Sequence, residues 1–239
     1  MSDTNQSISI IQDLSIILVA DVDLSKIISY KTFVEKNIVD SQWRLKQPET
    51  KTSTATHMFF ENGIHLVCNK NSLTFLESTN NKEIQNLEII SIIRKFVDNF
   101  SELSYKGISI NPNTFLVFPS SELKIARNYI FNNIFSSNIH KQLKVYPVRG
   151  SIYFDYILDL DEKLNNRILK LNISEKQLQI SADNLQAAVS FNGHFNYQIF
   201  GKNYEQKHQH ILQIIKGWKK DFEDYLEIVN KNFLNINSN

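Results

Sequence analysis

The pattern of apolar and polar residues near the N-terminus predicts a strand, a helix and a loop. Residues 14–20, LSIILVA, are apolar at both parities, which is typical of a strand that is buried on both faces. Asp23 is placed to cap the helix that follows. The apolar residues of this helix lie on or near one side: Leu24, Ile27, Ile28, Val34 and Ile38. Residues 40–53 are polar, contain Pro48 and predict a loop, in which Trp43 packs back on the body.

Three β-rich segments follow, and a helix comes after them. The pattern predicts strands near residues 54–60, 64–69 and 72–77. The dipeptide Asn62-Gly63 between the first two favours a hairpin, because both residues tolerate positive φ. Residues 86–103 then predict a helix, because their apolar side chains recur at helical spacing. These side chains are Ile89, Ile93, Phe96, Phe100 and Leu103.

The segment after this helix contains the most distinctive predicted loop. Residues 105–110, YKGISI, predict a strand, and Asn111, Pro112 and Asn113 predict a turn into the apolar segment 114–119. This turn is expected at the junction of two lobes, where grooves form. We therefore take Asn111, Pro112 and Asn113 as a candidate recognition loop, with an ordinary turn as the alternative.

The second half of the chain predicts a connecting helix, an antiparallel sheet and a closing helix. The connecting helix is expected over residues 121–135 and the closing helix over residues 205–231. Apolar residues between them recur with period two, which is typical of a sheet with one solvated face. They are Leu169, Leu171, Ile173, Leu178, Ile180, Phe195, Tyr197 and Ile199.

The two halves of the sequence also resemble each other in the order of their elements. FENGIHL and SFNGHFN both place Asn-Gly in a predicted hairpin, and each is followed by a long amphipathic helix. Residues 89–100 align with residues 211–222 without gaps. We therefore predict an α+β fold of two related lobes, each an antiparallel sheet covered by a long amphipathic helix. The lobes are residues 1–119 and 150–239, joined by a connecting helix and loop over 120–149, and they can pack as one domain.

A family resemblance rests on this order of elements. The hairpin, third strand, long helix and GISINP resemble a group of uncharacterised bacterial proteins, common in cyanobacteria, which also end with a long helix after a meander. The resemblance covers most of the chain. It implies a two-lobed α+β fold of unknown function in a bacterial protein, and it brings no catalytic residues with it.

Composition and charge narrow the class of protein. The 239 residues are 42% hydrophobic, enough for a sizeable core. Because 26 Lys and Arg balance 25 Asp and Glu, with Lys141, Lys144 and Arg149 as the nearest basic patch, no nucleic-acid partner is expected. The single cysteine, Cys68, fits a reducing compartment. The start does not have the pattern of a signal peptide, and no apolar run is long enough for a bilayer span, so we expect a soluble, cytoplasmic protein.

His208 and His210 are candidates for a metal or catalytic pair, and the predicted helix argues against that role. Residues two apart on a helix point about 200° apart, so the two side chains cannot bind one metal from a regular helix. On a strand they would face the same side, and a metal would be possible. The stripe that follows indicates a helix: Ile211, Ile215, Trp218, Phe222, Tyr225 and Val229. We expect His208 and His210 to pack at the start of the helix and to bind no metal. We expect the apolar stripe to cover its own sheet, with a contact to a second subunit as the alternative.

Cys68 and His57 form a second candidate, and hairpin register decides between two roles. With a two-residue loop at Asn62-Gly63, His57 faces Cys68, and a Cys–His pair is the minimum for nucleophilic catalysis. With a three-residue loop, Met58 faces Cys68. We expect the three-residue loop and a core thiol, because that register gathers apolar residues on one face. They are Met58, Phe60, Leu66 and Cys68.

The remaining motifs predict no chemistry. Asp155, Asp159, Asp161 and Glu162 suggest paired carboxylates for a divalent ion or glycoside hydrolysis, but the three aspartates have the parity of a solvated sheet face. Phosphate-binding loops, GxSxG and CxxC motifs are absent from the sequence. No cofactor is expected.

The function predicted from these observations is binding or assembly. We expect a non-enzymatic protein that acts through protein–protein contacts, including self-association. The alternative is a small-molecule binder or an enzyme of unfamiliar type, with a pocket between helix and sheet. Aromatic side chains would line such a pocket: Phe154, Tyr156, Phe195, Tyr197 and Trp218.

Overall fold

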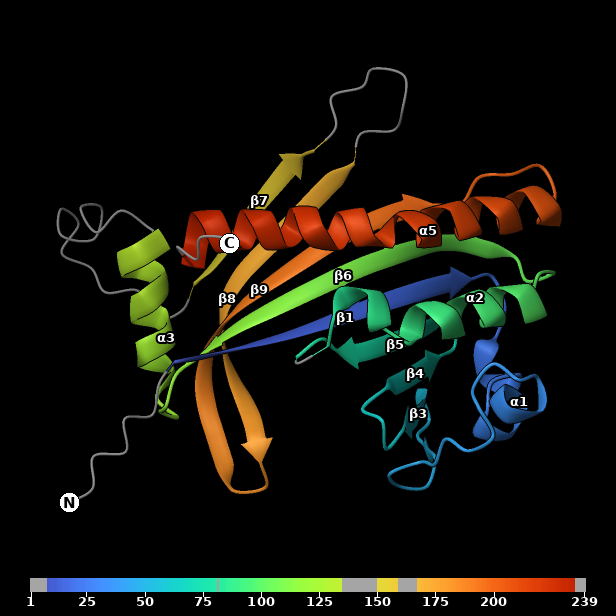
Figure 1. Cartoon of the computed structure of the whole chain (residues 1–239), viewed down its shortest axis with the longest axis horizontal. Coiled ribbons are helices and arrows are strands. Elements are labelled where there is room, and N and C mark those ends of the chain that lie inside the picture. The colour runs from blue at the N-terminus through green and yellow to red at the C-terminus, as the bar shows by residue number, and fades with distance from the viewer. Residues whose placement is uncertain (1–7, 81, 135–149, 159–166, 235–239) are drawn as a thin grey trace. The chain divides into compact units, whose positions relative to one another are not determined.

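The computed structural model describes residues 8–80, 82–134, 150–158 and 167–234 and shows an α+β fold with a large antiparallel sheet (Figure 1). The hydrogen-bonded strand order is β2-β3-β4-β5-β1-β6-β9-β8-β7. The strands are β1 (Ser9–Ala20), β2 (Thr50–Lys51), β3 (Ala55–Phe59), β4 (His65–Asn69), β5 (Ser72–Ser78), β6 (Tyr105–Val117), β7 (Ser151–Ile157), β8 (Ile168–Ser181) and β9 (Asn184–Gln198). The α-helices in this part of the chain are α1 (Tyr30–Glu35), α2 (Ile89–Asn99), α3 (Leu123–Tyr129) and α5 (Tyr204–Val229).

The chain divides into two compact units that each draw on distant parts of the sequence. Unit 1 comprises Met1–Gln12, Pro112–His194 and Glu223–Asn239, and unit 2 comprises Asp13–Asn111 and Phe195–Phe222. The long elements β1, β6, β9 and α5 therefore contribute residues to both units. Each unit combines segments from both of the predicted lobes, residues 1–119 and 150–239.

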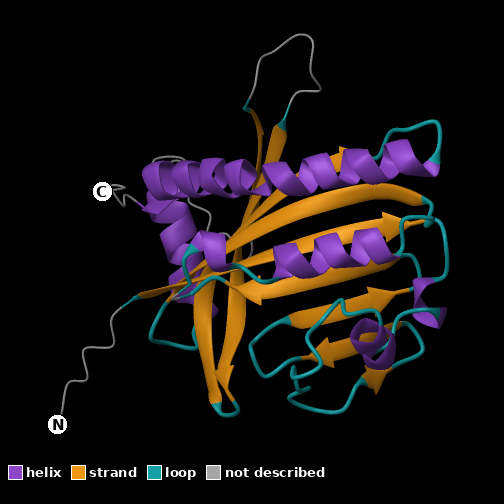
Figure 2. Ribbon diagram, turned by 45° about the vertical axis from the view of Figure 1, so that its right-hand side comes forward, coloured by secondary structure: helices purple, strands orange, loops and turns teal. Residues whose placement is uncertain are grey.

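In unit 2, α2 covers one face of the sheet (Figure 2). Its apolar stripe packs on β5, where buried residues alternate because residues two apart on a strand share a face. Phe96 lies at the centre of an aromatic cluster, with its ring centroid 5.8 Å from Phe33, 5.9 Å from Phe75 and 4.9 Å from Phe100. The buried apolar residues contributed by β1 and α2 are Leu14, Ile16, Leu18, Ala20, Ile89, Ile90, Ile92, Ile93, Phe96 and Val97.

The predicted strand 14–20 is longer than expected, and only one of its faces is fully buried. The strand starts at Ser9, and its even-numbered residues from Leu14 to Ala20 are buried. On the other face, Val19 is exposed and Ile17 is only partly covered. An apolar run at both parities therefore does not require two covered faces, since partly exposed apolar residues are common on folded proteins.

The hairpin predicted at Asn62-Gly63 is confirmed. The Phe60 N–H donates to Ile64 O at 2.9 Å, so Glu61, Asn62 and Gly63 form a three-residue loop, and Gly63 has a φ of 88°. Glycine suits this position because it adopts positive φ without a steric cost. The three predicted strands near residues 54–60, 64–69 and 72–77 correspond to β3, β4 and β5.

In unit 1, β7 and β8 form an antiparallel ladder, and α3 packs against β8. The ladder pairs residues from Ser151↔Ser174 to Ile157↔Ile168. Arg127 of α3 donates from Nε and Nη2 to the two carboxylate oxygens of Glu175, at 2.8 and 2.9 Å. This bidentate ion pair fastens α3 to β8.

The turn predicted at Asn111, Pro112 and Asn113 is wrong, because β6 runs straight through these residues. The residue before a proline is disfavoured in helical conformation and moves to the extended region, which a strand requires. Asn111 and Pro112 are buried and Asn113 is half-buried. These residues therefore form the interior of a strand, and a recognition role for them stays a prediction.

The second predicted Asn-Gly hairpin is also wrong. Asn192 and Gly193 lie inside β9, and the chain turns at Ala182 and Asp183, between β8 and β9. The apolar residues from Leu169 to Ile173 and from Leu178 to Ile180 belong to one continuous strand, β8. The internal repeat loses the shared turn as support and stays a prediction.

The helix predicted after Asp23 is shorter than its apolar pattern suggests. A single 3₁₀ turn spans Leu24–Lys26, and α1 begins only at Tyr30, capped by Ser29, whose Oγ accepts from the Thr32 N–H at 3.1 Å. The predicted helices over 86–103, 121–135 and 205–231 correspond to α2, α3 and α5. None of the helices within the described ranges is long and apolar enough to span a membrane.

Candidate functional site

Cys68 lies in the core, as the three-residue loop predicted, although the register differs in detail. The ladder pairs Thr56 with Cys68 and Met58 with Leu66, a shift of two residues from the predicted partners. A shift of two leaves every side chain on the same face, so Met58, Leu66 and Cys68 are all fully buried. Burial raises the pKa of the Cys68 thiol to about 12, with carboxylate charges adding to the effect. A thiol with this pKa is a poor nucleophile.

The structure brings together two histidines that stand apart in the sequence. His57 Nδ1 and His65 Nε2 lie 3.4 Å apart on the face opposite Cys68, and the ring of Phe59 stacks on His65 with a centroid distance of 3.7 Å. Burial, with a smaller contribution from the neighbouring His57, lowers the pKa of His65 to about 4. His65 is therefore neutral at physiological pH. Only the strand register reveals this stack, since the two residues are eight positions apart.

His208 and His210 bind different partners. His208 Nε2 donates to Asp98 Oδ1 at 2.9 Å, and His210 Nδ1 accepts the Phe200 N–H at 3.0 Å. Both residues lie in the first turns of α5, which begins at Tyr204. Among the residues with described positions, no three His, Cys, Asp or Glu side chains gather in a way that holds a metal ion.

Two buried carboxylates in unit 2 are absent from the predicted sites. Glu77 is fully buried, and its oxygens accept from Lys82 Nζ at 2.6 Å and from the Ile89 N–H at 3.0 Å. The first N–H groups of a helix lack partners within the helix, so Glu77 satisfies one of them at the start of α2. Asp221 of α5 accepts from the Tyr197 hydroxyl at 2.8 Å. Both carboxylates fasten helices to the sheet.

Some predicted candidates lie outside the described residues. These are Asp159, Asp161 and Glu162 of the acidic stretch and the basic patch of Lys141, Lys144 and Arg149. Asp155 is described and is exposed on β7, as its parity predicted. It lies directly across from Lys170 of β8.

The strand β7 is the clearest candidate interaction surface. It is the last strand in the hydrogen-bonded order, so among the described strands it pairs with β8 alone. Its seven residues, SIYFDYI, include one charge and no proline. The outward face exposes 72% of Tyr153 and 53% of Ile157, while Phe154 on the inner face packs against Phe233 with a centroid distance of 5.7 Å. A long, apolar edge of this kind is a template for pairing with another strand.

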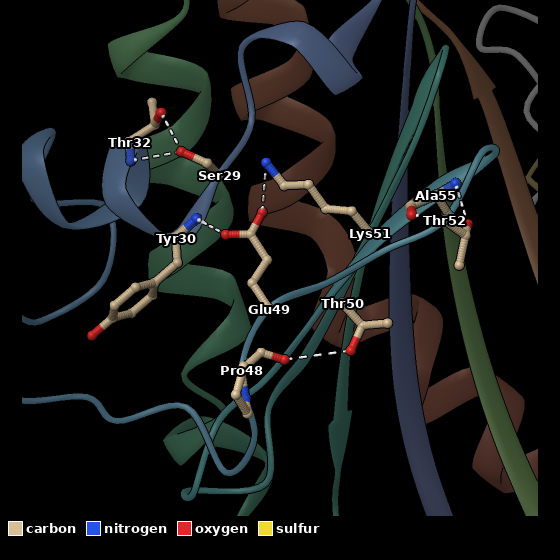
Figure 3. A network of polar contacts seen from close by, with 9 residues as sticks. All are labelled: Ser29, Tyr30, Thr32, Pro48, Glu49, Thr50, Lys51, Thr52 and Ala55. Carbon is tan, nitrogen blue, oxygen red and sulfur yellow. Dashed lines mark hydrogen bonds and ion pairs between the residues drawn. The ribbon is translucent and has the colours of Figure 1, made fainter.

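The opposite edge of the sheet is protected against such pairing. Strand β2 has only two residues, and the chain before it contains Pro48 (Figure 3). Glu49 ties this segment to α1, because its Oε2 accepts the Tyr30 N–H at 3.1 Å while Oε1 lies 3.3 Å from Lys51 Nζ. Short strands, proline and lysine are common devices that protect a sheet edge. The contrast between the edges singles out β7.

The comparisons with known proteins leave the chain without an assigned family. No protein-family model matches it, and no curated protein sequence matches it. The resemblance to a group of uncharacterised bacterial proteins therefore stays a prediction.

Proposed function

We propose that this chain is a non-enzymatic binding protein that assembles with another protein chain by strand addition at β7. The single observation that carries the proposal is the seven-residue edge of β7, which pairs with no second strand among the described residues and exposes Tyr153 and Ile157. In strand addition, backbone hydrogen bonds supply affinity and alternate side chains supply specificity. The protected β2 edge would direct assembly to one side of the sheet.

The surroundings of the reactive side chains support a binding role over catalysis. Cys68 is buried with a raised pKa, and His57 lies on the opposite face of the sheet. His208 and Asp98 bind each other, and Glu77 binds Lys82 and α2. Each of these polar groups has a partner that stabilises the fold.

Photo-crosslinking from β7 tests this proposal in the native host. A photoreactive amino acid in place of Tyr153 is expected to form a protein adduct, which mass spectrometry then identifies. The same amino acid in place of Leu185, an exposed residue of β9, is the control and should form no comparable adduct. Absence of any protein adduct at position 153 would refute strand addition at β7.

The small-molecule alternative stays a prediction, and its proposed aromatic lining has other contacts. In unit 2, Phe195 and Trp218 belong to the core and the Tyr197 hydroxyl binds Asp221. Native mass spectrometry of the untagged protein decides the matter, since a stoichiometric extra mass would support a bound ligand. A cytoplasmic location and two related lobes also stay predictions.

A further inference from the structure

We infer that the partner added at β7 is a second copy of this chain, paired antiparallel about a two-fold axis at Phe154. The inference rests on the proposed function and names the partner. A two-fold pair uses the same surface on both subunits, so β7 must be complementary to itself. Backbone direction, register and charge each bear on that requirement.

The backbone of β7 presents alternate residues to the open edge. The Leu158 N–H donates to Arg167 O at 2.9 Å, which makes this a hydrogen-bonded pair in the β7–β8 ladder. In an antiparallel ladder such pairs alternate, so Ile152, Phe154 and Tyr156 direct their N–H and C=O groups to β8. The odd-numbered residues direct theirs outward: Ser151, Tyr153, Asp155 and Ile157.

One register gives hydrogen-bond partners to the backbone groups of all four residues that face the open edge. With the axis at Phe154, Ser151 pairs with Ile157 of the second copy and Tyr153 pairs with its Asp155. Every outward N–H and C=O of β7 then has a partner. A shift of two residues toward the C-terminus places Asp155 opposite Asp155, which like charges disfavour, and leaves Ser151 unpaired. A shift of two residues the other way leaves Ile157 unpaired.

Side chains and charge fit the same register. Tyr153 would lie opposite the Asp155 carboxylate of the second copy, within reach of a hydrogen bond across the pair. Lys170 lies directly across from Asp155 on β8, so a positive charge accompanies each carboxylate. On the inner face Phe154 would meet its own copy beside the contact with Phe233.

Because the β2 edge is protected, assembly through β7 ends at a dimer. If β7 paired with the opposite edge of the next copy, the contact would repeat and form a fibre. The two-residue strand β2 and the segment around Pro48 offer no matching seven-residue ladder. Pairing of β7 with β7 leaves no open β7 edge on either copy. An interface of two seven-residue strands is small, so we expect a reversible, concentration-dependent dimer.

Subunit mass measured by native mass spectrometry and by light scattering tests the inference. Wild type is expected to shift from monomer to dimer as concentration rises. The N–H of residue 155 points to the open edge of β7, and proline lacks this N–H, so the Asp155→Pro variant should lose the dimer. The strand itself should tolerate the change, because proline occurs at strand edges. The matched Asp155→Ala variant keeps the N–H and should keep the dimer. A wild-type monomer at every concentration, or an Asp155→Pro variant that still forms the dimer, would overturn the inference.

Disulfide trapping tests the register even if the proline variant does not fold. The double variant Tyr153→Cys/Asp155→Cys should form a covalent dimer on mild oxidation, because paired residues lie within disulfide reach. The control Ser151→Cys/Asp155→Cys carries the same number of new thiols, but in the proposed register neither thiol lies opposite a cysteine of the second copy. This control should remain largely monomeric. Native Cys68 is buried and should not interfere. Rapid crosslinking of the control alone would overturn the register.

The two proposals fail in different ways. A photoadduct between position 153 and a different protein, with a strictly monomeric wild type, would refute the self-pairing and leave the proposed function standing. No adduct and no dimer would refute both.

Discussion

At the residue scale, Gly193 illustrates how a local signal is reassigned by packing. Its dipeptide with Asn192 favours a turn, yet the structure needs the missing side chain and no positive φ. A Cβ at this position would lie 2.6 Å from Cδ2 of Tyr225 and 3.1 Å from Pro112 Cγ. The Tyr225 hydroxyl donates to Phe191 O at 2.6 Å, which holds the ring against the strand.

The Gly193→Ala variant should therefore unfold at a lower urea concentration than wild type. Overpacking of this kind costs about 1–3 kcal/mol in the free energy of unfolding. Gly217→Ala is the matched control, because nothing lies within 4 Å of its Cβ position in α5. Alanine should stabilise that helix by about 0.5–1 kcal/mol. Equal midpoints for wild type and Gly193→Ala would contradict the packing role.

His65 gives a pH-dependent prediction at the same scale. Its pKa is about 4 in the folded chain, mainly through burial, against about 6.5 for an unperturbed histidine. Between these values the unfolded chain binds a proton that the folded chain does not, so acidification from pH 6.5 to 4 should lower the free energy of unfolding. His65→Phe keeps the stack on Phe59 and should show a weaker pH dependence over that interval. Parallel curves from urea unfolding would refute this assignment.

At the scale of elements, α5 shows why an amphipathic stripe is a dependable signal. The predicted residues Ile211, Ile215 and Phe222 are all buried, because a 3.6-residue period places them on one side. Polar contacts then determine how the helix attaches, through Tyr197–Asp221 in unit 2 and Tyr225–Phe191 in unit 1. The pattern predicts the buried side of the helix, and these contacts specify its partners.

Trp218→Ala tests the burial of this side. Trp218 is 7% exposed, so its truncation should lower the free energy of unfolding by about 3–5 kcal/mol. The exposed neighbour Lys216 provides a control, since Lys216→Ala should change stability by no more than about 0.5 kcal/mol. Thermal and urea unfolding measure both variants. A small effect of Trp218→Ala on the free energy of unfolding would indicate that the indole contributes little to the core and serves to bind a partner.

At the scale of the whole molecule, each compact unit depends on segments far apart in the sequence. Unit 2 needs residues 195–222 as well as residues 13–111. Its core includes Phe195, Ile211 and Ile215, which a chain that ends earlier lacks. Cutting the chain at the predicted lobe boundary would therefore remove part of this core.

A fragment of residues 1–119 tests this dependence. It should show no cooperative unfolding transition, because the apolar surface that the missing helix covers would remain exposed. Circular dichroism on heating, with the full-length chain as reference, measures the outcome. A cooperative transition in the fragment would mean that the N-terminal lobe folds by itself.

The sequence by itself determined the elements whose signals are local. Apolar period predicted α2, α5 and the strands β3–β5, and Asn62-Gly63 predicted its hairpin because Gly63 adopts positive φ. Tertiary structure alone decided that Asn111–Asn113 and Asn192-Gly193 lie inside strands, since packing against neighbouring strands and Tyr225 outweighs the local preference for a turn. It also decided that His57 meets His65 and that β7 is an edge, because strand order depends on distant partners and no local pattern encodes it.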